Sequence, residues 1–343
     1  MPTVYFIAGE FAMNITAAEP APTISVVVPV YRSEGTLREL HRRLVGVLAP
    51  QGASFEIIFV EDCGGDESWQ VIEDLGRRDT RVRGICLSRN FGQHNALLCG
   101  IRAARHQVVV TIDDDLQNPP EEIPKLLSKL RDGCDVVYGA PERAQHGFLR
   151  GCASSITRIA LAGAMGARTA RHVSAFRAFR TPIREAFNGY RSAFVSIDVL
   201  LTWGTTRFDH VRVRHDARTV GASNYTVQKL ITHAINMTTG FTTLPLQLAS
   251  VLGFVFSLFG LGVLAYVIAV YFVRGGSVPG FPFLASVIAI FSGVQLFALG
   301  IIGEYLARMH LRSMERPPYL VREELSSSAA PRAEVEGVAC RGA

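Results

Sequence analysis

Carboxylate side chains stand at the ends of two apolar, β-branched runs of the sequence. Residues 61–62 read Glu-Asp directly after one run, and residues 113–115 read Asp-Asp-Asp directly after another. Three consecutive carboxylates at the end of an apolar strand repel one another unless a cation neutralises their charge. Hard divalent ions such as Mg²⁺ and Mn²⁺ take oxygen ligands from one or two carboxylates and from the phosphates of a substrate. The pattern therefore predicts a site for a divalent metal and a nucleotide diphosphate.

The Asp triplet also has a second interpretation. Asp is common in the turn before a helix, so residues 113–115 alone are equally compatible with a solvated turn that caps a helix at residues 119–130. The acidic pair Glu61 and Asp62, at the end of a neighbouring predicted strand, favours the metal site instead. Neither a GxGxxG nor a GxxxxGK[ST] motif occurs in the sequence, which argues against a dinucleotide-binding fold and a P-loop.

The elements that position these carboxylates alternate between short apolar runs and amphipathic stretches. The runs are rich in Val and Ile, whereas Leu37, Leu40 and Leu44 follow helical spacing. The repeated alternation predicts an α/β fold, with a mostly parallel sheet and helices on both faces. In such sheets ligands bind beyond the carboxyl ends of the strands, where the acidic residues stand. The predicted strands are residues 24–30, 55–60, 82–87, 108–112 and 135–138.

Four segments resemble, in the same order, the successive blocks of family 2 glycosyltransferases with the GT-A fold. They read ISVVVPVYRSE (24–34), FEIIFVEDCGGD (55–66), LSRNFGQHN (87–95) and TIDDDLQNPP (111–120). Within this family they look most like the polyprenyl-phosphate glycosyltransferases, such as dolichyl-phosphate mannose synthase and the bacterial undecaprenyl-phosphate sugar transferases. The resemblance extends to about Leu325. It implies a GT-A catalytic domain at residues 23–225 after an N-terminal extension, residues 1–22, that we expect to be disordered.

The resemblance also implies roles for individual residues on the donor side of the site. The implied nucleotide-binding residues are Pro29, Tyr31, Glu34, Glu61, Asp62, Arg89, Asp113 and Asp114. The implied ligands of Mg²⁺ or Mn²⁺ are Asp113, Asp115 and Gln117. One departure concerns residues 61–64, which read Glu-Asp-Cys-Gly where relatives usually have Asp-Asp-Gly-Ser, and it leaves the nucleobase open between UDP- and GDP-sugars.

Arginine is concentrated on the implied acceptor side. Residues 141–218 hold thirteen Arg and no Lys against five acidic residues. Arginine recognises phosphate groups and anionic lipid headgroups, whereas no aromatic interleaving or known motif favours nucleic acid as a partner. The resemblance implies acceptor-phosphate contacts at Arg143, Arg150, Ser154 and Ser223, and catalytic roles for Asp113, Asp115, Arg177 and Arg218. Asn224 replaces the usual Lys of the segment that holds Arg218 and Ser223.

The last third of the chain has the composition of a membrane anchor. Leu230 to Val273 and Gly275 to Gly303 contain no charged residue, and 48% of the whole chain is hydrophobic against 19% charged. We expect an interfacial amphipathic helix at residues 226–245 and a hairpin of two transmembrane helices at about 246–273 and 283–305. The roughly 225 ordinary residues before them exclude a multi-span transporter. A tail follows at residues 307–343, disordered from about 326.

The charges around the hairpin predict its orientation. One cation lies in the short connector, at Arg274, whereas Arg308, Arg312 and Arg316 follow the second span. Cytoplasmic loops carry the excess of Arg and Lys, so we expect a multi-pass protein of the bacterial inner membrane with both termini and the catalytic domain in the cytoplasm.

Together with these features, the resemblance implies an inverting, metal-dependent transfer of a sugar from a nucleotide diphosphate to polyprenyl phosphate. The acceptor is mostly dianionic at pH 7, so a dedicated general base is not obligatory. Transfer to another lipid or glycan acceptor is an alternative, as is a membrane protein that binds sugar nucleotides without catalysis. The resemblance also implies a homo-oligomer, a tetramer in the family.

Overall fold

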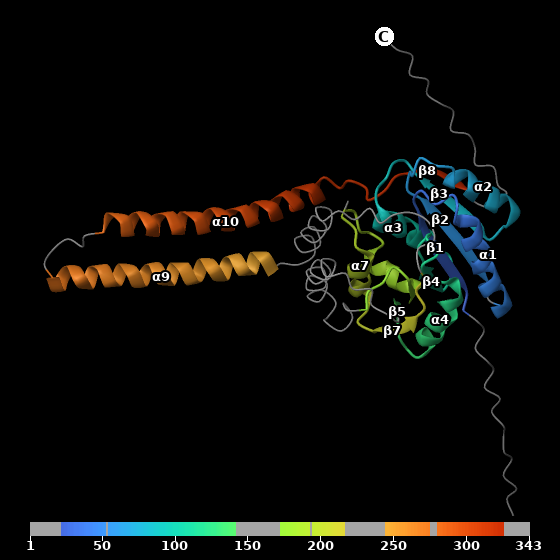
Figure 1. Cartoon of the computed structure of the whole chain (residues 1–343), viewed down its shortest axis with the longest axis horizontal. Helices are drawn as coiled ribbons and strands as arrows, with labels where there is room; N and C mark the ends of the chain where they lie inside the picture. Colours follow the sequence, from blue (N-terminus) through green and yellow to red (C-terminus); the bar gives the residue numbers. More distant parts are fainter. Residues whose placement is uncertain are drawn as a thin grey trace, which may run out of the picture.

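The computed structural model describes residues 22–52, 54–141, 172–192, 194–216, 244–274 and 280–325. These residues form an α/β domain and two long helices that project from it side by side (Figure 1). Arg143, Arg150, Ser154, Arg218, Ser223 and most of the predicted interfacial helix lie outside the described residues.

The described part of the domain is built on a mixed sheet of eight strands in the order β7-β5-β6-β4-β1-β2-β3-β8. β1 is parallel to β2 and β4, and β2 is parallel to β3, whereas β6 and β8 run antiparallel to their neighbours. The strands are β1 (Ile24–Val30), β2 (Phe55–Glu61), β3 (Val82–Leu87), β4 (Val108–Thr111), β5 (Val136–Pro141), β6 (Arg177–Arg180), β7 (Phe208–Val213) and β8 (Val321–Leu325). The mostly parallel α/β sheet predicted from the alternation is confirmed.

Helices cover both faces of the sheet, which explains why β1 and β2 are apolar almost throughout and fully buried. One face packs against α1 (Leu37–Leu48), α2 (Ser68–Arg78) and α4 (Ile123–Arg131). The other packs against α3 (Gln93–Ala103), the 3₁₀ helix η3 (Thr181–Phe187) and α7 (Ile197–Gly204). α3 approaches β1 closely at Gly100, where any Cβ would lie 2.4 Å from Val27 Cγ1. A larger residue at this position would push α3 away from the sheet.

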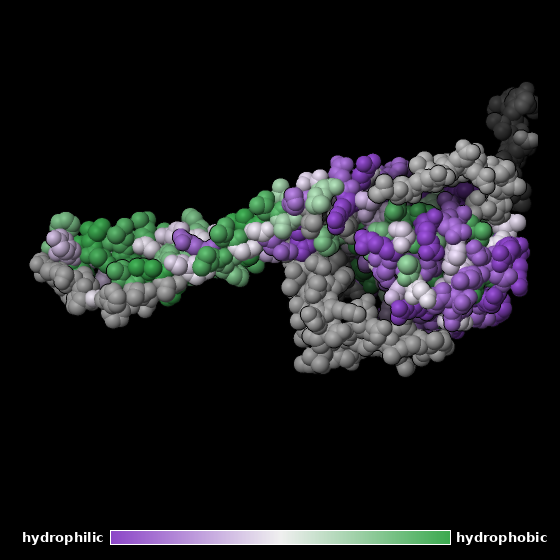
Figure 2. All heavy atoms as spheres, turned by 90° about the horizontal axis from the view of Figure 1, so that it is seen from above, coloured by the Kyte–Doolittle hydropathy of each residue, from purple (hydrophilic) through white to green (hydrophobic). Residues whose placement is uncertain are grey.

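The two projecting helices are α9 (Leu244–Arg274) and α10 (Phe281–Ser313). Both contain a stretch that is long and apolar enough to cross a membrane, Pro245–Val273 and Ile290–His310. The ring of Phe291 on α10 packs against Phe256 and Phe259 on α9. Figure 2 shows that hydrophobic side chains dominate the surface of this pair, whereas hydrophilic residues cover much of the visible surface of the domain. Near the end of α10, Glu304 and Arg308 pair across one helical turn, which adds a small stabilisation to the helix.

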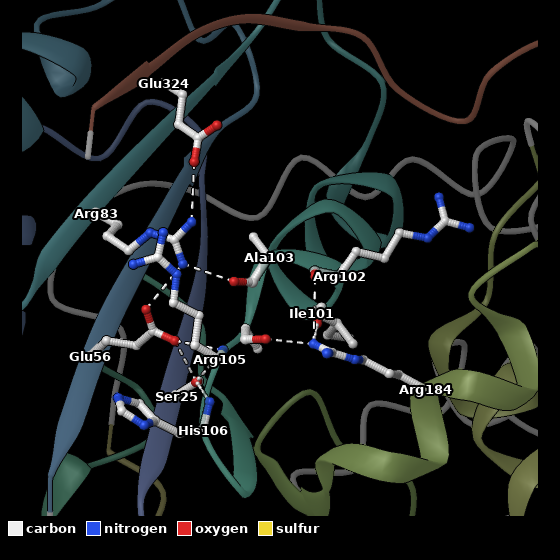
Figure 3. A network of polar contacts seen from close by, with 11 residues as sticks. Ser25, Glu56, Arg83, Ile101, Arg102, Ala103, Arg105, His106, Arg184 and Glu324 are labelled. Carbon is white, nitrogen blue, oxygen red and sulfur yellow. Dashed lines mark hydrogen bonds and ion pairs between the residues drawn. The ribbon is translucent and has the colours of Figure 1, made fainter. Parts of the chain in front are cut away.

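The chain returns to the domain after α10 and adds β8 to the edge of the sheet beside β3. Arg83 on β3 connects the two strands, because its guanidinium lies 3.1 Å from Glu324 on β8 and 3.0 Å from Glu56 on β2 (Figure 3). The same side chain donates a hydrogen bond to the carbonyl of Ala103 at the end of α3. β8 is not among the strands predicted from the sequence.

Candidate active site

The loops that follow β1, β2 and β4 meet at the carboxyl ends of these three adjacent strands. Each loop contains one non-glycine residue with a left-handed backbone, namely Arg32 (φ 56°), Cys63 (φ 52°) and Leu116 (φ 61°). This conformation is unfavourable for residues with a Cβ and is concentrated at functional sites. The three loops therefore mark one candidate site at the edge where the acidic residues were expected.

Asp114 joins the first and third of these loops. Its Oδ2 accepts a hydrogen bond from the backbone N–H of Tyr31 at 3.0 Å and another from the hydroxyl of Ser33 at 2.5 Å. These two hydrogen bonds tie the loop after β1 to the loop after β4 through one carboxylate oxygen. Asp114 therefore positions the loop after β1, and its neighbours Asp113 and Asp115 are the residues that the sequence predicts as cation ligands.

Asp113 and Asp115 carry concentrated negative charge at the end of β4. Burial, together with the charges of Asp115 and Asp114, raises the pKa of Asp113 to about 7. Asp113 accepts a hydrogen bond from Gln93 at 2.7 Å, and Asp115 accepts one from the backbone N–H of Gln117 at 3.1 Å. Such a site favours a bound cation, because a cation at the carboxylates stabilises their ionised form.

The donor atoms fit a divalent ion that is shared with a substrate. Among the described residues, no group of three or more His, Cys, Asp or Glu side chains is arranged to hold a metal by itself. Mg²⁺ and Mn²⁺ do not require such a group, since one or two carboxylates with water and substrate phosphates complete the coordination. The side chains of Asp113, Asp115 and Gln117 offer carboxylate and amide-carbonyl oxygens. Such oxygen ligands suit Mg²⁺ and Mn²⁺ and disfavour softer metals.

Glu61 and Asp62 are buried, and both carboxylates are engaged with the protein. Asp62 accepts hydrogen bonds from the backbone N–H groups of Phe91 and Gly92, at 2.7 and 2.8 Å. Burial nevertheless raises the pKa of Asp62. Glu61 accepts one hydrogen bond from the backbone N–H of Gly64 and another from the thiol of Cys86. The acidic pair therefore fixes the loops after β2 and β3 in place.

The remaining residues expected on the nucleotide side differ in accessibility. Pro29 is buried within β1, whereas Tyr31 is 45% exposed at the end of the strand. Glu34 accepts a hydrogen bond from the backbone N–H of Glu67, and the guanidinium of exposed Arg89 lies 4.4 Å from the ring centroid of Phe91. Tyr31 and Arg89 therefore present side chains to solvent at this edge, and Pro29 does not.

Arg177, expected among the catalytic residues, is buried behind the carboxylates. Its guanidinium pairs with Asp198 and donates a hydrogen bond to the hydroxyl of Thr111, the last residue of β4. The hydroxyl of Tyr138 donates a hydrogen bond to the same oxygen of Asp198 at 3.1 Å. The charge of Arg177 opposes the rise in the pKa of Asp113, although its side chain is only 1% exposed. Arg177 therefore affects the site in two ways. Its charge acts to lower the pKa of Asp113, and its hydrogen bond to Thr111 holds the end of β4.

Comparison with known proteins identifies the family of the chain. A family model described as Glycosyl transferase family 2 matches residues 25–178. The undecaprenyl-phosphate 4-deoxy-4-formamido-L-arabinose transferase of Pseudomonas aeruginosa is 34% identical over 324 residues, which cover 92% of this chain and 94% of that protein. The chain belongs to the family 2 glycosyltransferases. The protein of the same name from Salmonella dublin is 32% identical to this glycosyltransferase over 320 residues. The match covers 92% of the glycosyltransferase and 98% of the Salmonella protein.

One similar solved structure is mannosyl-3-phosphoglycerate synthase from Rubrobacter xylanophilus. It matches with a TM-score of 0.49 and 13% identity over 64% of this glycosyltransferase and 73% of that chain.

In the glycosyltransferase the segment that follows β7 also contacts the loop after β4, residues 112–119, which we call the Asp-rich loop. The backbone N–H of Asp216 donates a hydrogen bond to the carbonyl of Gln117 at 2.8 Å, and His215 Nδ1 lies 3.3 Å from Asn118 Oδ1. Asp198, Tyr138 and Thr111 were not singled out in the sequence. The only signal available was Asp198 itself, the one charged residue within the mostly apolar segment VSIDVLL (195–201).

Proposed function

We propose that this glycosyltransferase moves a sugar from a nucleotide diphosphate sugar to polyprenyl phosphate at the cytoplasmic face of the membrane, with inversion of the anomeric centre. The observation that carries the proposal is the combination of Asp113 and Asp115 at the strand ends with an apolar helical hairpin in the same chain. The Pseudomonas and Salmonella relatives are named for transfer to undecaprenyl phosphate, which supports the same acceptor class here.

The donor binds across the loops that follow β1, β2 and β4 in this proposal. Asp113, Asp115 and Gln117 hold Mg²⁺ or Mn²⁺, which when bound supplies a Lewis acid for the departing diphosphate. Tyr31 is the accessible side chain for the base and ribose, and Arg89 for the phosphates. Glu61, Asp62 and Asp114 act indirectly, because their hydrogen bonds fix the loops that the nucleotide contacts.

The acceptor phosphate is itself the nucleophile. It is mostly dianionic at pH 7, so the protein has to position it and screen its charge rather than remove a proton. Arg143, Arg150, Ser154 and Ser223 are the proposed phosphate contacts, and Arg218 is proposed at the reacting centre. A single displacement by this phosphate inverts the sugar configuration, and no covalent intermediate on the protein is required.

The hairpin accounts for how the two substrates meet. A polyprenyl chain gains about 0.8 kcal/mol for each buried CH₂, so the acceptor stays in the bilayer. α9 and α10 bring the catalytic domain to that surface. We propose a location in the bacterial inner membrane, with two spans and with the domain and both termini in the cytoplasm, and a homo-oligomer as in the resembling family.

Reconstitution with defined substrates tests the proposal. Full-length protein in detergent micelles is incubated with undecaprenyl phosphate and each of a panel of UDP- and GDP-sugars, and the lipid extract is analysed by mass spectrometry. A glycosyl phosphate lipid that forms with one donor, and whose anomeric configuration is opposite to that of the donor by NMR, is the expected result. Nucleotide binding without transfer to any polyprenyl phosphate would instead identify a binding protein, and transfer only to a hydroxyl acceptor would identify another lipid or glycan as the acceptor.

A further inference from the structure

A pocket lies beside the C-terminal end of α10, which we call its base. The lining of the pocket includes no residue of the Asp-rich loop. Its volume is about 360 Å³, and its lining includes Phe187, Tyr190, Arg191, Ser192 and Trp203. This volume is at the lower end of the range of about 300–1,000 Å³ that is typical of ligand pockets. The pocket is formed by the end of η3, the loop that follows it and the last turn of α7. None of the described carboxylates of the candidate active site lines this pocket, and Trp203 and Asp198 lie near opposite ends of α7.

Hydrogen bonds to its backbone carbonyls hold the loop that forms the pocket in place. One guanidinium nitrogen of Arg102 donates hydrogen bonds to the carbonyls of Asn188 and Tyr190, each at 2.7 Å. The ring of Tyr319 packs against the same guanidinium, with 5.8 Å between the ring centroid and Cζ. The hydroxyl of Tyr190 donates a hydrogen bond to the carbonyl of Phe194 at 2.6 Å. The pocket is therefore preorganised by the protein rather than formed by a loose loop.

The rim of the pocket combines an exposed aromatic residue with an available cation. Trp203 is 53% exposed and packs edge-on against Tyr190, with 5.5 Å between the ring centroids. The side chain of Arg191 is 71% exposed, and its contact with Glu315 is a 3.8 Å ion pair between two exposed groups. Such a pair contributes little free energy, so an anion can replace Glu315 at small cost.

The pocket lies at the level where the apolar part of α10 ends. Glu315 comes two residues after the last residue of α10, and the guanidinium of Arg308 packs over the ring of Phe194 in the loop beyond the pocket. In Figure 1 α7 lies on the side of the domain that faces the base of the hairpin. If the hairpin spans the bilayer, as proposed above, the candidate span ending at His310 places this loop in the headgroup layer.

We propose that this pocket binds the phosphate headgroup of an anionic phospholipid of the surrounding bilayer. Arg191 contacts the phosphate in place of Glu315, since arginine matches phosphate geometry and is attracted to anionic lipid surfaces. Trp203 and Tyr190 lie at the boundary between headgroups and acyl chains, where aromatic side chains with a polar edge are favoured. The occupant is a bulk lipid rather than the acceptor, and it fixes the height of the domain above the membrane.

The chain offers a direct test because it contains only two tryptophans. Trp69 packs against β3 at Gly84, on α2, which Figure 1 places at the end of the domain remote from the hairpin. The variant Trp69→Phe leaves Trp203 as the only indole, and Trp203→Phe leaves Trp69. Both are prepared as full chains in nanodiscs of zwitterionic or mixed anionic lipid, with spin-labelled lipids that carry the label near the headgroup or at the end of the acyl chain.

We expect the headgroup label to quench Trp203 strongly, the chain-end label to quench it less, and neither label to quench Trp69. Anionic lipid in place of zwitterionic lipid should increase the quenching of Trp203, and Arg191→Gln should reduce the apparent affinity for the anionic lipid about fivefold, as expected for one cation at an anionic surface. Arg42→Gln, on the exposed face of α1, is the matched control and should change nothing. In the Trp203→Phe background, where Trp69 is the only indole, Arg191→Gln should leave the emission spectrum unchanged. That result shows that the fold is intact.

Three results would overturn the assignment. Trp203 that is quenched by an aqueous quencher but by neither lipid label does not contact the bilayer. Quenching that is independent of lipid charge and of Arg191 leaves no phosphate site. A response to added polyprenyl phosphate in zwitterionic nanodiscs, with none to anionic phospholipid, would assign the pocket to the acceptor. Membrane insertion itself is measured separately by retention of the protein in the nanodiscs, so a failure of the pocket assignment and a failure of the proposed anchor are distinguishable.

Discussion

Arg177 on β6 and Asp198 at the start of α7 form an ion pair that is buried directly behind the last residue of β4. Removing one member of a buried pair leaves the other charge uncompensated, at a cost of about 3–5 kcal/mol. The pair therefore fixes the distance between the sheet and α7, and it also places a positive charge behind Asp113.

We predict that Asp198→Leu lowers the free energy of unfolding by about 3 kcal/mol or more, because Arg177 then keeps its charge without a partner. Tyr138→Phe removes only one hydrogen bond to the same carboxylate and should cost about 1 kcal/mol. Thermal unfolding of the detergent-solubilised protein measures both. Equal effects of the two variants would contradict a dominant role for the ion pair.

Asp115→Asn should abolish most of the sugar transfer while the protein is still made and inserted normally. Asn retains one oxygen donor but removes the charge that holds a divalent ion, and each tenfold loss of rate corresponds to about 1.4 kcal/mol of transition-state stabilisation. Initial rates with saturating donor and acceptor provide the measurement, with excess EDTA on the parent protein as a parallel arm. Asp132→Asn, on the exposed turn after α4, is the matched control. Near-normal transfer by Asp115→Asn would mean that this residue only caps the turn.

Arg150→Ala should weaken use of the lipid phosphate and leave binding of the donor nucleotide almost unchanged. A hydrogen bond to a charged group contributes about 1.5–3 kcal/mol, which corresponds to a loss of roughly tenfold or more in kcat/KM for the acceptor. Nucleotide affinity is measured by calorimetry and acceptor use by a titration of polyprenyl phosphate. If nucleotide affinity fell instead, the arginine cluster would have to be assigned to the donor.

A cysteine at position 277, replacing Ser277 in the connector of the hairpin, should be labelled by an impermeant thiol reagent added to intact cells. Tags before Thr23 and after Ala343 should remain inaccessible until the cells are opened. The reason is the excess of cations after the second span compared with the connector. Labelling of either tag from outside would reverse the proposed orientation.

Acid should reveal the contribution of Asp79 to stability. Burial alone would raise the pKa of this carboxyl, but hydrogen bonds from Arg81 and from His41 outweigh burial and lower it to about 2. A lowered carboxyl pKa stabilises the folded state above the unfolded value near 3.8, and this contribution is lost as the pH falls toward 2. The shift corresponds to about 2 kcal/mol. Asp79→Asn should therefore be less stable than the parent at pH 7, and this difference in unfolding free energy should shrink steadily between pH 4 and pH 2.

The carboxyl ends of β1, β2 and β4 were predictable because they depend on local signals. Apolar runs of five to seven residues that are followed by polar or acidic residues specify both the strands and the place where they stop, and β1 and β3 have the bounds expected from sequence. The confirmed part of the prediction is therefore the sheet, and Asp113 and Asp115 follow β4 at its carboxyl end. Their metal and nucleotide ligands stay predictions.

The parts that the sequence did not reveal depend on contacts between distant segments. β6 inserts antiparallel between β4 and β5, so Arg177 becomes buried beside Asp198, and no local pattern specifies that pairing. Whether Asp62 and Asp114 face solvent or the backbone amides of another loop also depends on loop geometry that residue type alone does not set. An Asp that holds two loops together cannot be distinguished by residue type from an Asp that binds a metal.

β8 has a consequence for biosynthesis. It follows both membrane helices in the chain, yet it occupies the edge of the sheet beside β3, with Gly84 opposite Leu325. While the ribosome is still producing α9 and α10, the N–H and C=O groups along that edge of β3 have no strand to pair with, and an open edge of this kind is prone to pair with other chains. The sheet of the domain is thus completed only after α9 and α10 have been synthesised. A chain truncated before α9 would expose the unpaired edge of β3 and would be prone to aggregate.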